Sequence, residues 1–515
     1  MIFFQKQSGM EANMPQPEEK ARNLYIKKKY ASALNEFLQL DHQYLKNTDI
    51  LVMIANCYDA TGDKKHALKY YKKAWWRQPR SETINANLAI THYELGNILR
   101  SYFYARLALL INSENPSAAV VLGNIAYRRK KYMKALCHYK KALKVRPDFY
   151  TANFNAAGIY YDMKNYPAAY FYGLRTTTLY PKSEEAQALF ADICLEQNKS
   201  DEALKILTAI YPKHKKDYWL CDSLSRAYQQ QQHYAEALEM GWKAMTVSKG
   251  ENSQHINFGY MLYEISLEFS QAKVNVYAKK WMNKYPSNPI VSHMANAIIN
   301  GENISQVNGI FVREIFDTFA NDFEEVLHNL NYKVPFLISK SLDSLYANLK
   351  LKKMKILDVG CGTGLCGKYL KKYAKMGGLD GVDISPEMLK IAKQKKVYSH
   401  LYNQDLKEFL DSHPDSYDLI TAADVFTYFG ELNQLFILLY NSLRKNGRVL
   451  FSVSENNYNE NDYFLHQSGR FLHNQKYIEN SLKRQGFFVE KLNRACLRNE
   501  GEKKVYGWIV MAQKQ

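Results

Sequence analysis

Residues 356–367 read "ILDVGCGTGLCG", an apolar run that ends in an acid and continues into glycines at alternate positions. Gly360, Gly362 and Gly364 leave the backbone without side chains, so a ligand can approach it closely. An apolar strand followed by such a loop and then by a helix is typical of the first turn of a nucleotide-binding sheet. The stretch therefore predicts an α/β domain with a ligand at this turn.

The chain around this stretch has the same alternating character. From about residue 310, short apolar runs alternate with amphipathic stretches, which favours a mostly parallel, Rossmann-like α/β sheet. We expect seven strands, at residues 355–359, 376–382, 397–403, 417–422, 447–454, 487–492 and 506–511. The last two, separated by "NRACLRNEGEKK", should close the sheet as an antiparallel hairpin.

The charge at the glycine loop constrains the ligand. A dinucleotide fingerprint requires a glycine where Leu365 stands, and Asp358 is expected where a pyrophosphate would meet the helix N-terminus. A carboxylate repels a phosphate and attracts an ammonium group, by roughly 4 kcal/mol at about 4 Å and an effective dielectric constant near 20. The interpretation is a ligand with an amine and no phosphate, such as S-adenosylmethionine.

Two further acids follow the next predicted strands. Asp383 can accept protons from both ribose hydroxyls, and Asp405 can accept one from an adenine amino group. Ile384 and Met388 would pack on the adenine, and Leu406 would cover the ring. Each acid alone is more often a helix N-cap. Three acids at successive strand ends favour a cofactor site.

These motifs resemble those of class I S-adenosylmethionine-dependent methyltransferases, over residues 310–515. The resemblance implies that S-adenosylmethionine is the cofactor. We predict that it is held by Asp358, Gly360, Cys361, Gly362, Gly364, Asp383, Ile384, Met388, Asp405 and Leu406.

The segment after the fourth strand, "AADVFTYFG" at residues 422–430, should face the methyl acceptor. It lacks the Pro-Pro-aromatic motif of DNA amino-methyltransferases, the Pro-Cys pair of cytosine-C5 enzymes and the paired glutamates of arginine methyltransferases. His473 is the candidate general base, or else a surface histidine on a helix. Arg470 either pairs with a substrate carboxylate or caps a loop. The candidate catalytic residues are Asp424, Tyr428, Arg470 and His473, with Arg498 and Glu500 as further members.

An aromatic segment precedes the sheet. In "FDTFANDFEEVLHNLNY", Phe316, Phe319 and Phe323 fall on one helical face by their spacing. We expect a helix pair that packs over the cofactor, either as a lid that excludes water or as core.

The N-terminal half is an internal repeat. Small residues recur at one constant interval in two registers, at Ala21, Ala55, Ala89, Gly123, Ala157, Ala191, Ser225 and Gly259, and at Ala33, Ala67, Ser101, Ala135, Ala169, Ala203 and Ala237. This pattern resembles tetratricopeptide repeats, with about eight units over residues 14–285. It predicts an α-solenoid, because each helix pair buries its apolar face only against its neighbours. The whole chain resembles a bacterial group of predicted methyltransferases that carry such repeats.

The resemblance also implies a concave binding surface for a protein or peptide. Possible contacts are Tyr25, Tyr93, Tyr127, Tyr161 and Tyr263, with Asn56 and Asn124. The alternative is that the tyrosines pack locally between adjacent repeats.

Four segments are expected: a disordered N-terminus at 1–13, the solenoid with a capping helix at 14–300, a linker at 301–309 and the methyltransferase domain at 310–515. The seven cysteines show no metal-like spacing, so we expect no metal and a reducing compartment. No apolar run is long enough to cross a bilayer and "MIFF" is too short for a signal peptide, so we expect a cytoplasmic location. The net charge of +18 is spread over helix faces, which makes nucleic acid an unlikely partner.

The sequence thus predicts methyl transfer to an unidentified acceptor, with the solenoid recruiting a protein or peptide. One alternative is a small-molecule acceptor with repeats that serve assembly only. Another is a repeat scaffold without catalysis, which the intact glycine loop and the three acids disfavour.

Overall fold

The computed structural model describes residues 16–40, 46–299, 305–346, 354–374, 377–500 and 503–515. The predicted disordered N-terminus at 1–13 lies outside these residues, as do residues 301–304 of the predicted linker. The chain forms two compact units that divide between His214 and Lys215. The boundary predicted near residue 300, between the repeats and the α/β domain, rests on the sequence pattern alone and stays a prediction.

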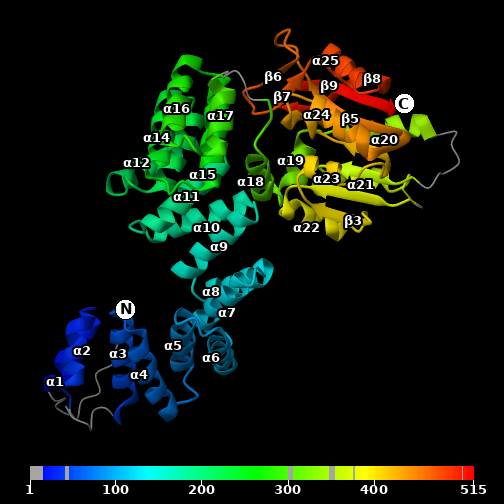
Figure 1. Ribbon diagram of the computed structural model, residues 1–515. Helices are drawn as coiled ribbons and strands as arrows, with labels where there is room; N and C mark the ends of the chain where they lie inside the picture. Colours follow the sequence, from blue (N-terminus) through cyan, green and yellow to red (C-terminus); the bar gives the residue numbers. More distant parts are fainter. Residues whose placement is uncertain (1–15, 41–45, 300–304, 347–353, 375–376, 501–502) are drawn as a thin grey trace. The chain divides into compact units, whose positions relative to one another are not determined.

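The first unit consists of antiparallel helix pairs (Figure 1). These are α1 Gln16–Ile26, α2 Tyr30–Leu38, α3 Thr48–Ala60, α4 Lys64–Arg77, α5 Glu82–Glu94, α6 Ile98–Ile111, α7 Pro116–Arg128, α8 Tyr132–Val145, α9 Tyr150–Asp162, α10 Tyr166–Leu179, α11 Glu184–Glu196 and α12 Ser200–Ile210. From α3 to α11, the first helices of the pairs begin at evenly spaced positions: 48, 82, 116, 150 and 184. The solenoid predicted from the repeat is confirmed.

The turn inside each pair repeats with the helices. A residue with positive φ ends the first helix of each pair, at the same constant interval: Lys28, Gly62, Gly96, Lys130, Lys164 and Asn198. A left-handed residue at this place is the usual way to end a helix. Glycine occupies only two of the six positions, so the sequence marks the turn less clearly than the structure does.

The small residues of the repeat lie where two helices touch. Ala55, Ala67, Ala89 and Ala157 are fully buried. At Gly123 a Cβ atom would lie 2.4 Å from Cε1 of Tyr139, which belongs to the partner helix. Helix contact therefore explains the small-residue register.

Replacing Gly123 by alanine should destabilise the first unit by about 1–3 kcal/mol, because the new methyl group would overlap the Tyr139 ring. Gly158, on α9, is the matched control: a Cβ placed there would have no atom within 4 Å, and Gly158→Ala should stabilise the helix by about 0.5–1 kcal/mol. Urea unfolding of both variants measures the difference. Equal effects from the two substitutions would contradict close contact at Gly123.

The second unit begins with two more helix pairs and a single helix. The pairs are α13 Tyr218–Gln230 with α14 Tyr234–Val247, and α15 Asn252–Ser266 with α16 Gln271–Lys284; α17 Pro289–Ile299 follows. The described residues thus hold eight pairs, as predicted, and α17 takes the place of the expected capping helix. Over the described residues, no helix has the length and apolar character needed to cross a membrane.

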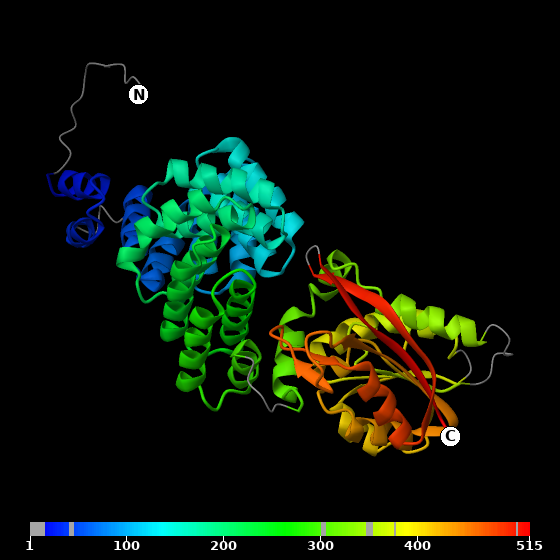
Figure 2. The same cartoon turned by 90° about the horizontal axis from the view of Figure 1, so that it is seen from above.

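The rest of this unit is a mostly parallel sheet with an antiparallel end (Figure 2). Its strands are β1 Ile356–Val359, β2 Leu379–Asp383, β3 His400–Asn403, β4 Tyr417–Ala422, β5 Leu443–Glu455, β6 Tyr463–Leu465, β7 Phe471–His473, β8 Phe487–Glu500 and β9 Lys503–Lys514. The order is β3-β2-β1-β4-β5-β7-β6, and β9 pairs antiparallel with both β5 and β8.

The predicted strands are all present, with two differences. The expected connection at 493–504 is mostly strand, because β8 and β9 continue their pairing to Glu500 and Lys503 across two register shifts. The short strands β6 and β7 form an unpredicted antiparallel hairpin. Such short runs carry too little alternation to be read from sequence.

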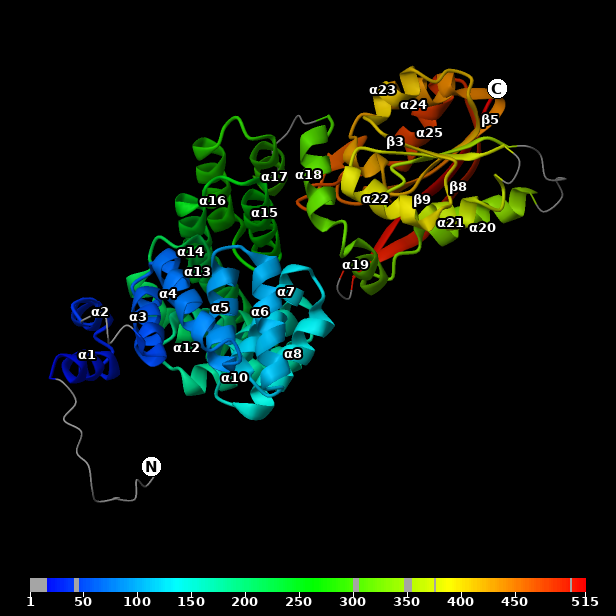
Figure 3. The ribbon, with the colours of Figure 1, turned by 90° about the horizontal axis from the view of Figure 1, so that it is seen from below.

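Helices cover the sheet and its carboxyl edge. They are α18 Gly309–Phe319, α19 Phe323–Asn329, α20 Val334–Tyr346, α21 Leu365–Leu370, α22 Pro386–Lys395, α23 Leu406–Asp411, α24 Asn433–Ser442 and α25 Gln475–Arg484. Helix α18 lies between the last repeat helices and the sheet domain, in contact with α15 and α17 on one side and α22 on the other (Figure 3).

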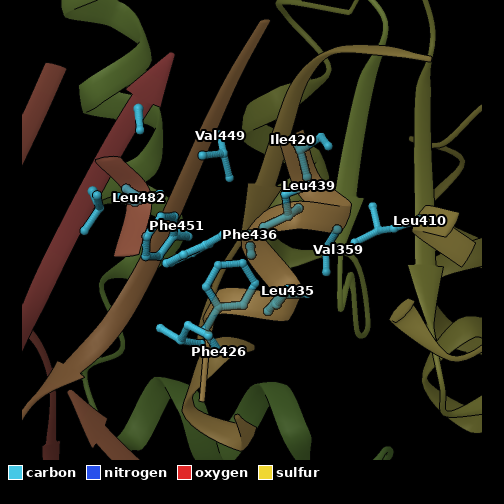
Figure 4. Packing of buried hydrophobic residues seen from close by; sticks show 14 of the residues in the cluster. Val359, Leu410, Ile420, Phe426, Leu435, Phe436, Leu439, Val449, Phe451 and Leu482 are labelled. Carbon is cyan, nitrogen blue, oxygen red and sulfur yellow. The ribbon is translucent and has the colours of Figure 1, made fainter. Parts of the chain in front are cut away.

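Alternate residues of the central strands enter two different cores. Val359, Ile420 and Val449 pack with Phe436 and Leu439 of α24 on one face (Figure 4). The residues in the opposite phase pack with α20 and α21 on the other face; they are Ile356, Leu419 and Leu450. Burial on both faces is why these strands appear as continuous apolar runs.

A third core joins the repeats to the sheet domain. Trp281 and Ile290 of the repeats belong to the same buried cluster as Phe311 of α18 and Phe471 of β7. The last two repeats and the sheet domain are therefore packed as one body.

Candidate active site

A cavity opens at the carboxyl ends of the parallel strands. It encloses about 1140 Å³ free of atoms, part of it open to solvent. Parallel α/β sheets place their ligands at this edge, because the loops after the strands converge there. Eight of the fourteen predicted site residues line it: Gly360, Asp383, Ile384, Asp405, Leu406, Asp424, Tyr428 and Arg470.

Asp383 connects the glycine loop to the end of β2. Its Oδ2 accepts the backbone N–H of Gly362 at 2.8 Å, and its Oδ1 accepts that of Ser385 at 2.8 Å. Burial raises the pKa of this carboxyl to about 6, although the two N–H groups favour its charged form. Each oxygen retains a lone pair that can accept a hydroxyl proton.

The loop requires glycine at its start. Gly360 has φ +58°, and a Cβ atom there would lie 2.4 Å from Cγ2 of Val425. Any side chain would therefore displace Val425, which itself lines the cavity.

Asp405 is both a helix cap and a cavity residue. Its Oδ1 accepts the N–H of Lys407 at the start of α23, at 2.8 Å. The side chain also lines the cavity beside Ile384 and Leu406. A Cβ placed on Gly309 would lie 4.0 Å from Asp405 Oδ2 and 3.2 Å from Ile384 Cδ1, so α18 begins directly over these groups.

Asp358 lies elsewhere than expected. Its side chain is 1% exposed and is not part of the cavity lining. The Tyr398 hydroxyl donates to its Oδ2 at 2.7 Å and the Thr421 hydroxyl to its Oδ1 at 3.1 Å. The carboxyl thus stands behind the glycine loop, and our expectation of a negative charge at the mouth of the cleft is corrected for this residue.

Four other predicted cofactor residues also stand behind the cavity wall. Cys361 and Met388 are buried, and Gly364 precedes α21 with φ +85°. Together with Gly362, they shape the loop and support the lining without belonging to it.

His473 is buried on β7 instead of lying on a surface helix, and it does not line the cavity. Its Nε2–H donates to the carbonyl oxygens of Phe429, at 2.8 Å, and Gly430, at 3.2 Å. Burial lowers the pKa of the ring to about 4. The geometry corrects the expectation of a base at the acceptor: His473 holds the segment after β4 in place.

The far end of the cavity is charged. Asp424, in the left-handed region with φ +61°, points its Oδ2 to Nη1 of Arg470 at 3.5 Å and to Nη1 of Arg498 at 3.4 Å. Arg498 also pairs with Glu500 at 2.8 Å. Among the described residues, Asp424 Oδ1 and Arg470 Nη1 are buried without a hydrogen-bond partner. This end therefore offers one acceptor, Asp424 Oδ1, and one donor, Arg470 Nη1, which is ion-paired with Asp424 Oδ2 but makes no hydrogen bond to the described residues.

The helices before the sheet form an apolar wall. The ring of Phe316 lies edge-on to Tyr428 at 5.8 Å and to Phe323 at 6.0 Å, and both phenylalanines line the cavity. Phe319 packs on Phe323 at 6.1 Å, outside the lining. An ion pair between Glu324 and Lys395 connects α19 to α22. The predicted helix pair is present over the cavity.

Sequence reasoning missed several lining residues, among them Gly309, Leu327, Tyr332, Lys407 and Val425. Only the aromatic spacing around Phe316 signalled that this region faces a ligand. No group of three or more histidines, cysteines or acids suited to a metal occurs in the described ranges.

Several of the repeat residues proposed for ligand contact are hydrogen-bonded to other side chains of the repeats. In the first unit, Asn56 Nδ2 donates to the Tyr25 hydroxyl at 2.7 Å, and its Oδ1 accepts the Tyr71 hydroxyl at 2.6 Å. Asn124 Oδ1 likewise accepts two bonds, from Tyr139 and Asn155. The local-packing alternative fits these residues.

Tyrosine exposure differs along the column. Tyr127 is 41% exposed and its hydroxyl donates to Asp162 at 3.1 Å. Tyr93 and Tyr161 are half-buried. In the second unit, Tyr263 lies beside His466 of the sheet domain, with ring centres 6.3 Å apart.

Replacing Asp358 by asparagine gives a pH-dependent change in stability. Burial raises the pKa of this carboxyl from 3.8 to about 7, so the folded state binds its proton more tightly than the unfolded state. The contribution of this carboxyl to the stability of the wild-type chain therefore decreases as the pH rises from about 4 to about 7. Asparagine does not titrate and can still bond Tyr398 and Thr421. Its stability relative to wild type should increase across this window by roughly 2–4 kcal/mol.

Urea unfolding at about pH 4 and about pH 7.5 measures this difference. The control is Asp411→Asn, which replaces an exposed acid and should leave the buried site of Asp358 unchanged. A difference between wild type and Asp358→Asn that is constant with pH would contradict a buried, titrating Asp358.

A glycine loop after β1, acids after β2 and β3 and a cavity at their carboxyl ends define a class I methyltransferase fold. Residues 357–449 match the family described as a methyltransferase domain, and residues 219–250 match the tetratricopeptide repeat family. The chain therefore combines a stretch similar to tetratricopeptide repeats with a stretch similar to a methyltransferase domain.

Curated relatives match part of this domain. The malonyl-[acyl-carrier protein] O-methyltransferase of Halalkalibacterium halodurans is 31% identical over 148 residues, which is 28% of this chain and 54% of the relative. A second such enzyme, from Ilyobacter polytropus, is 34% identical over 106 residues, covering 20% of this chain and 40% of the relative. The chain spans about half the length of these relatives.

Among solved structures, the repeat protein YrrB, described with an unusual peptide-binding site, has 19% identity and a TM-score of 0.33, covering 36% of this chain and 95% of that one. A methyltransferase from Methanosarcina mazei has 16% identity and a TM-score of 0.29, covering 33% and 96%.

Proposed function

We propose that this chain transfers a methyl group from S-adenosylmethionine to an acceptor recruited by its repeats. The observation that carries the proposal is Asp383, which lines the cavity and is bonded to the glycine loop at Gly362. A carboxylate in this position is suited to a ribose and unsuited to a phosphate. The family match and the relatives support the same chemistry.

The lining residues fit the two ends of this cofactor. At one end, Asp383 can accept the ribose hydroxyls and Asp405 the adenine amino group, between Ile384 and Leu406. At the other end, Asp424 Oδ1 can accept an ammonium proton and Arg470 Nη1 can donate to a carboxylate, since both atoms have no hydrogen-bond partner among the described residues. An amino-acid tail would satisfy both.

The strand order supports this placement of the cofactor, with the adenine near Asp405 and the amino-acid tail near Asp424. Asp405 follows β3, Asp383 ends β2, Gly360 follows β1 and Asp424 follows β4, in the order in which these strands lie side by side. Neighbouring strands are about 4.8 Å apart, so roughly 10 Å separate the ends of β2 and β4. An extended nucleoside with an amino-acid tail can span that distance.

The bound cofactor supplies an electrophilic methyl group for direct displacement. The chain supplies positioning, which can contribute up to about 7–11 kcal/mol, and the wall of Phe316 and Phe323 keeps water away. No histidine lines the cavity in the part of the chain that is described. An acceptor that is already nucleophilic at neutral pH, such as a carboxylate, suits this arrangement.

The repeats would raise the local concentration of a protein or peptide that carries the acceptor. The alternative keeps the same chemistry and makes the acceptor a free metabolite, with repeats that serve assembly. The engaged side chains of Asn56 and Asn124 favour that alternative, whereas the exposed Tyr127 favours recruitment.

Incubation of the full chain with methyl-labelled S-adenosylmethionine and cell lysate, followed by separation by size, tests the proposal. We expect label in a macromolecular fraction, absent with Asp383→Ala. Label confined to metabolites would overturn recruitment, and no transfer together with no cofactor binding would overturn the activity itself.

A further inference from the structure

We infer that His293, on the helix that caps the repeats, is a positioning residue for Arg470, so the end of the solenoid completes one end of the methyltransferase cavity. The inference rests on the proposed function, because it assigns Arg470 to the amino-acid tail of the cofactor. It adds a structural role for the repeats besides recruitment.

Arg470 is the last residue of a tight turn between β6 and β7. Within the turn, the N–H of His466 donates to the carbonyl of Arg470 at 2.9 Å, and the N–H of Gly469 donates to that of His466 at 2.9 Å. Gly469 has φ +78°, which favours glycine. The backbone of the turn thus determines where the Arg470 side chain leaves it.

Three helices of the repeat region hold this turn. His293 of α17 donates from Nε2 to the carbonyl oxygen of Gly469 at 2.8 Å. Gln467 accepts the Ser266 hydroxyl of α15 at 3.3 Å and donates to Gln271 of α16 at 3.0 Å. A Cβ on Gly469 would lie 3.3 Å from His293 Nε2, so the ring lies directly against the turn.

His293 is itself fixed. It is 3% exposed, and its ring centre lies 4.5 Å from that of Phe311 on α18. Burial holds the pKa of the ring below its ordinary value. Because the carbonyl of Gly469 can only accept, Nε2 carries the proton that it donates.

The bond from His293 affects the cavity through the side chain of Arg470. Arg470 follows Gly469 directly and reaches the cavity, where its Nη1 lies 3.5 Å from Asp424 Oδ2. A bond from His293 to Gly469 fixes the backbone one residue away. Without that bond the turn can shift, and the guanidinium moves out of line with a ligand carboxylate.

Calorimetry with two nucleosides tests this inference in the full chain. S-adenosylhomocysteine carries the amino-acid tail and 5′-methylthioadenosine lacks it. His293→Leu should weaken the binding of S-adenosylhomocysteine by about tenfold and leave the affinity for methylthioadenosine unchanged. We expect the same pattern for Arg470→Met. His293→Gln should restore the affinity, because the glutamine amide can donate at the position of Nε2.

The outcomes separate the two proposals. A wild-type chain that binds neither nucleoside overturns the proposed function. If wild type binds both and Arg470→Met loses only the tailed ligand, but His293→Leu retains it, the positioning role is overturned. Equal weakening of both ligands in the leucine and glutamine variants also overturns it, because that pattern indicates general loss of structure.

Discussion

Replacing Asp383 by alanine should weaken the binding of S-adenosylmethionine by at least about a hundredfold. Two hydrogen bonds to a charged group are worth about 1.5–3 kcal/mol each, and both ribose hydroxyls would lose their acceptor. The N–H groups of Gly362 and Ser385 would also lose their shared partner, so the glycine loop would keep its backbone bond from Cys361 to Val382 of β2 but lose its side-chain bond to that strand. Calorimetric titration of the full chain measures the affinity.

The matched control is Glu387→Ala, a nearby acid on α22 that does not line the cavity. Its affinity for the cofactor should equal that of wild type. Asp383→Asn keeps the shape of the side chain and loses its charge. Its affinity for the cofactor should fall between those of wild type and Asp383→Ala. Equal affinities of wild type and Asp383→Ala would show that the cofactor binds elsewhere.

Replacing Trp281 by alanine should destabilise the second unit by about 3–5 kcal/mol, the usual cost of deleting a large buried aromatic side chain. Trp281 is fully buried, and its Nε1 donates to His255 at 3.1 Å. It shares a cluster with Phe311 and Phe471, so the loss should reach the sheet domain and lower the affinity for S-adenosylhomocysteine.

Urea unfolding with cofactor binding as a second readout measures this effect. Trp76→Ala is the control, because the Trp76 side chain is 79% exposed. The free energy of unfolding of this variant should differ from that of wild type by no more than about 0.5 kcal/mol. A Trp281 variant whose repeats unfold early while the sheet domain keeps its midpoint would contradict a shared core.

The sequence was most informative where a physical requirement repeats. A helix pair needs a small residue at each close contact, and this requirement recurs once in every repeat, so the constant interval between the helix starts at 48, 82 and 116 follows from it. The hairpin of β6 and β7 has no such repetition. Its position depends on contacts with residues far earlier in the chain, such as that of Gln271 with Gln467, which no local pattern records.

The site was predictable to the level of strand ends. Asp383 and Asp405 lie at the ends of β2 and β3 and line the cavity, since parallel strands end at one edge. The side of the sheet that a side chain enters was harder to predict. Asp358 and His473 lie in strands buried on both faces, where apolar runs carry no alternation to orient them.

The helices of the first unit are regularly spaced along the chain. The core that joins repeats to the sheet domain takes its repeat residues from the last two repeats and the helix after them. The residues of that core all lie after residue 214, so a change in the number of repeats before it would leave the residues of the core in place. Removal of either of the final two repeats would instead remove residues from this core. The length of the array can therefore evolve separately from the chemistry.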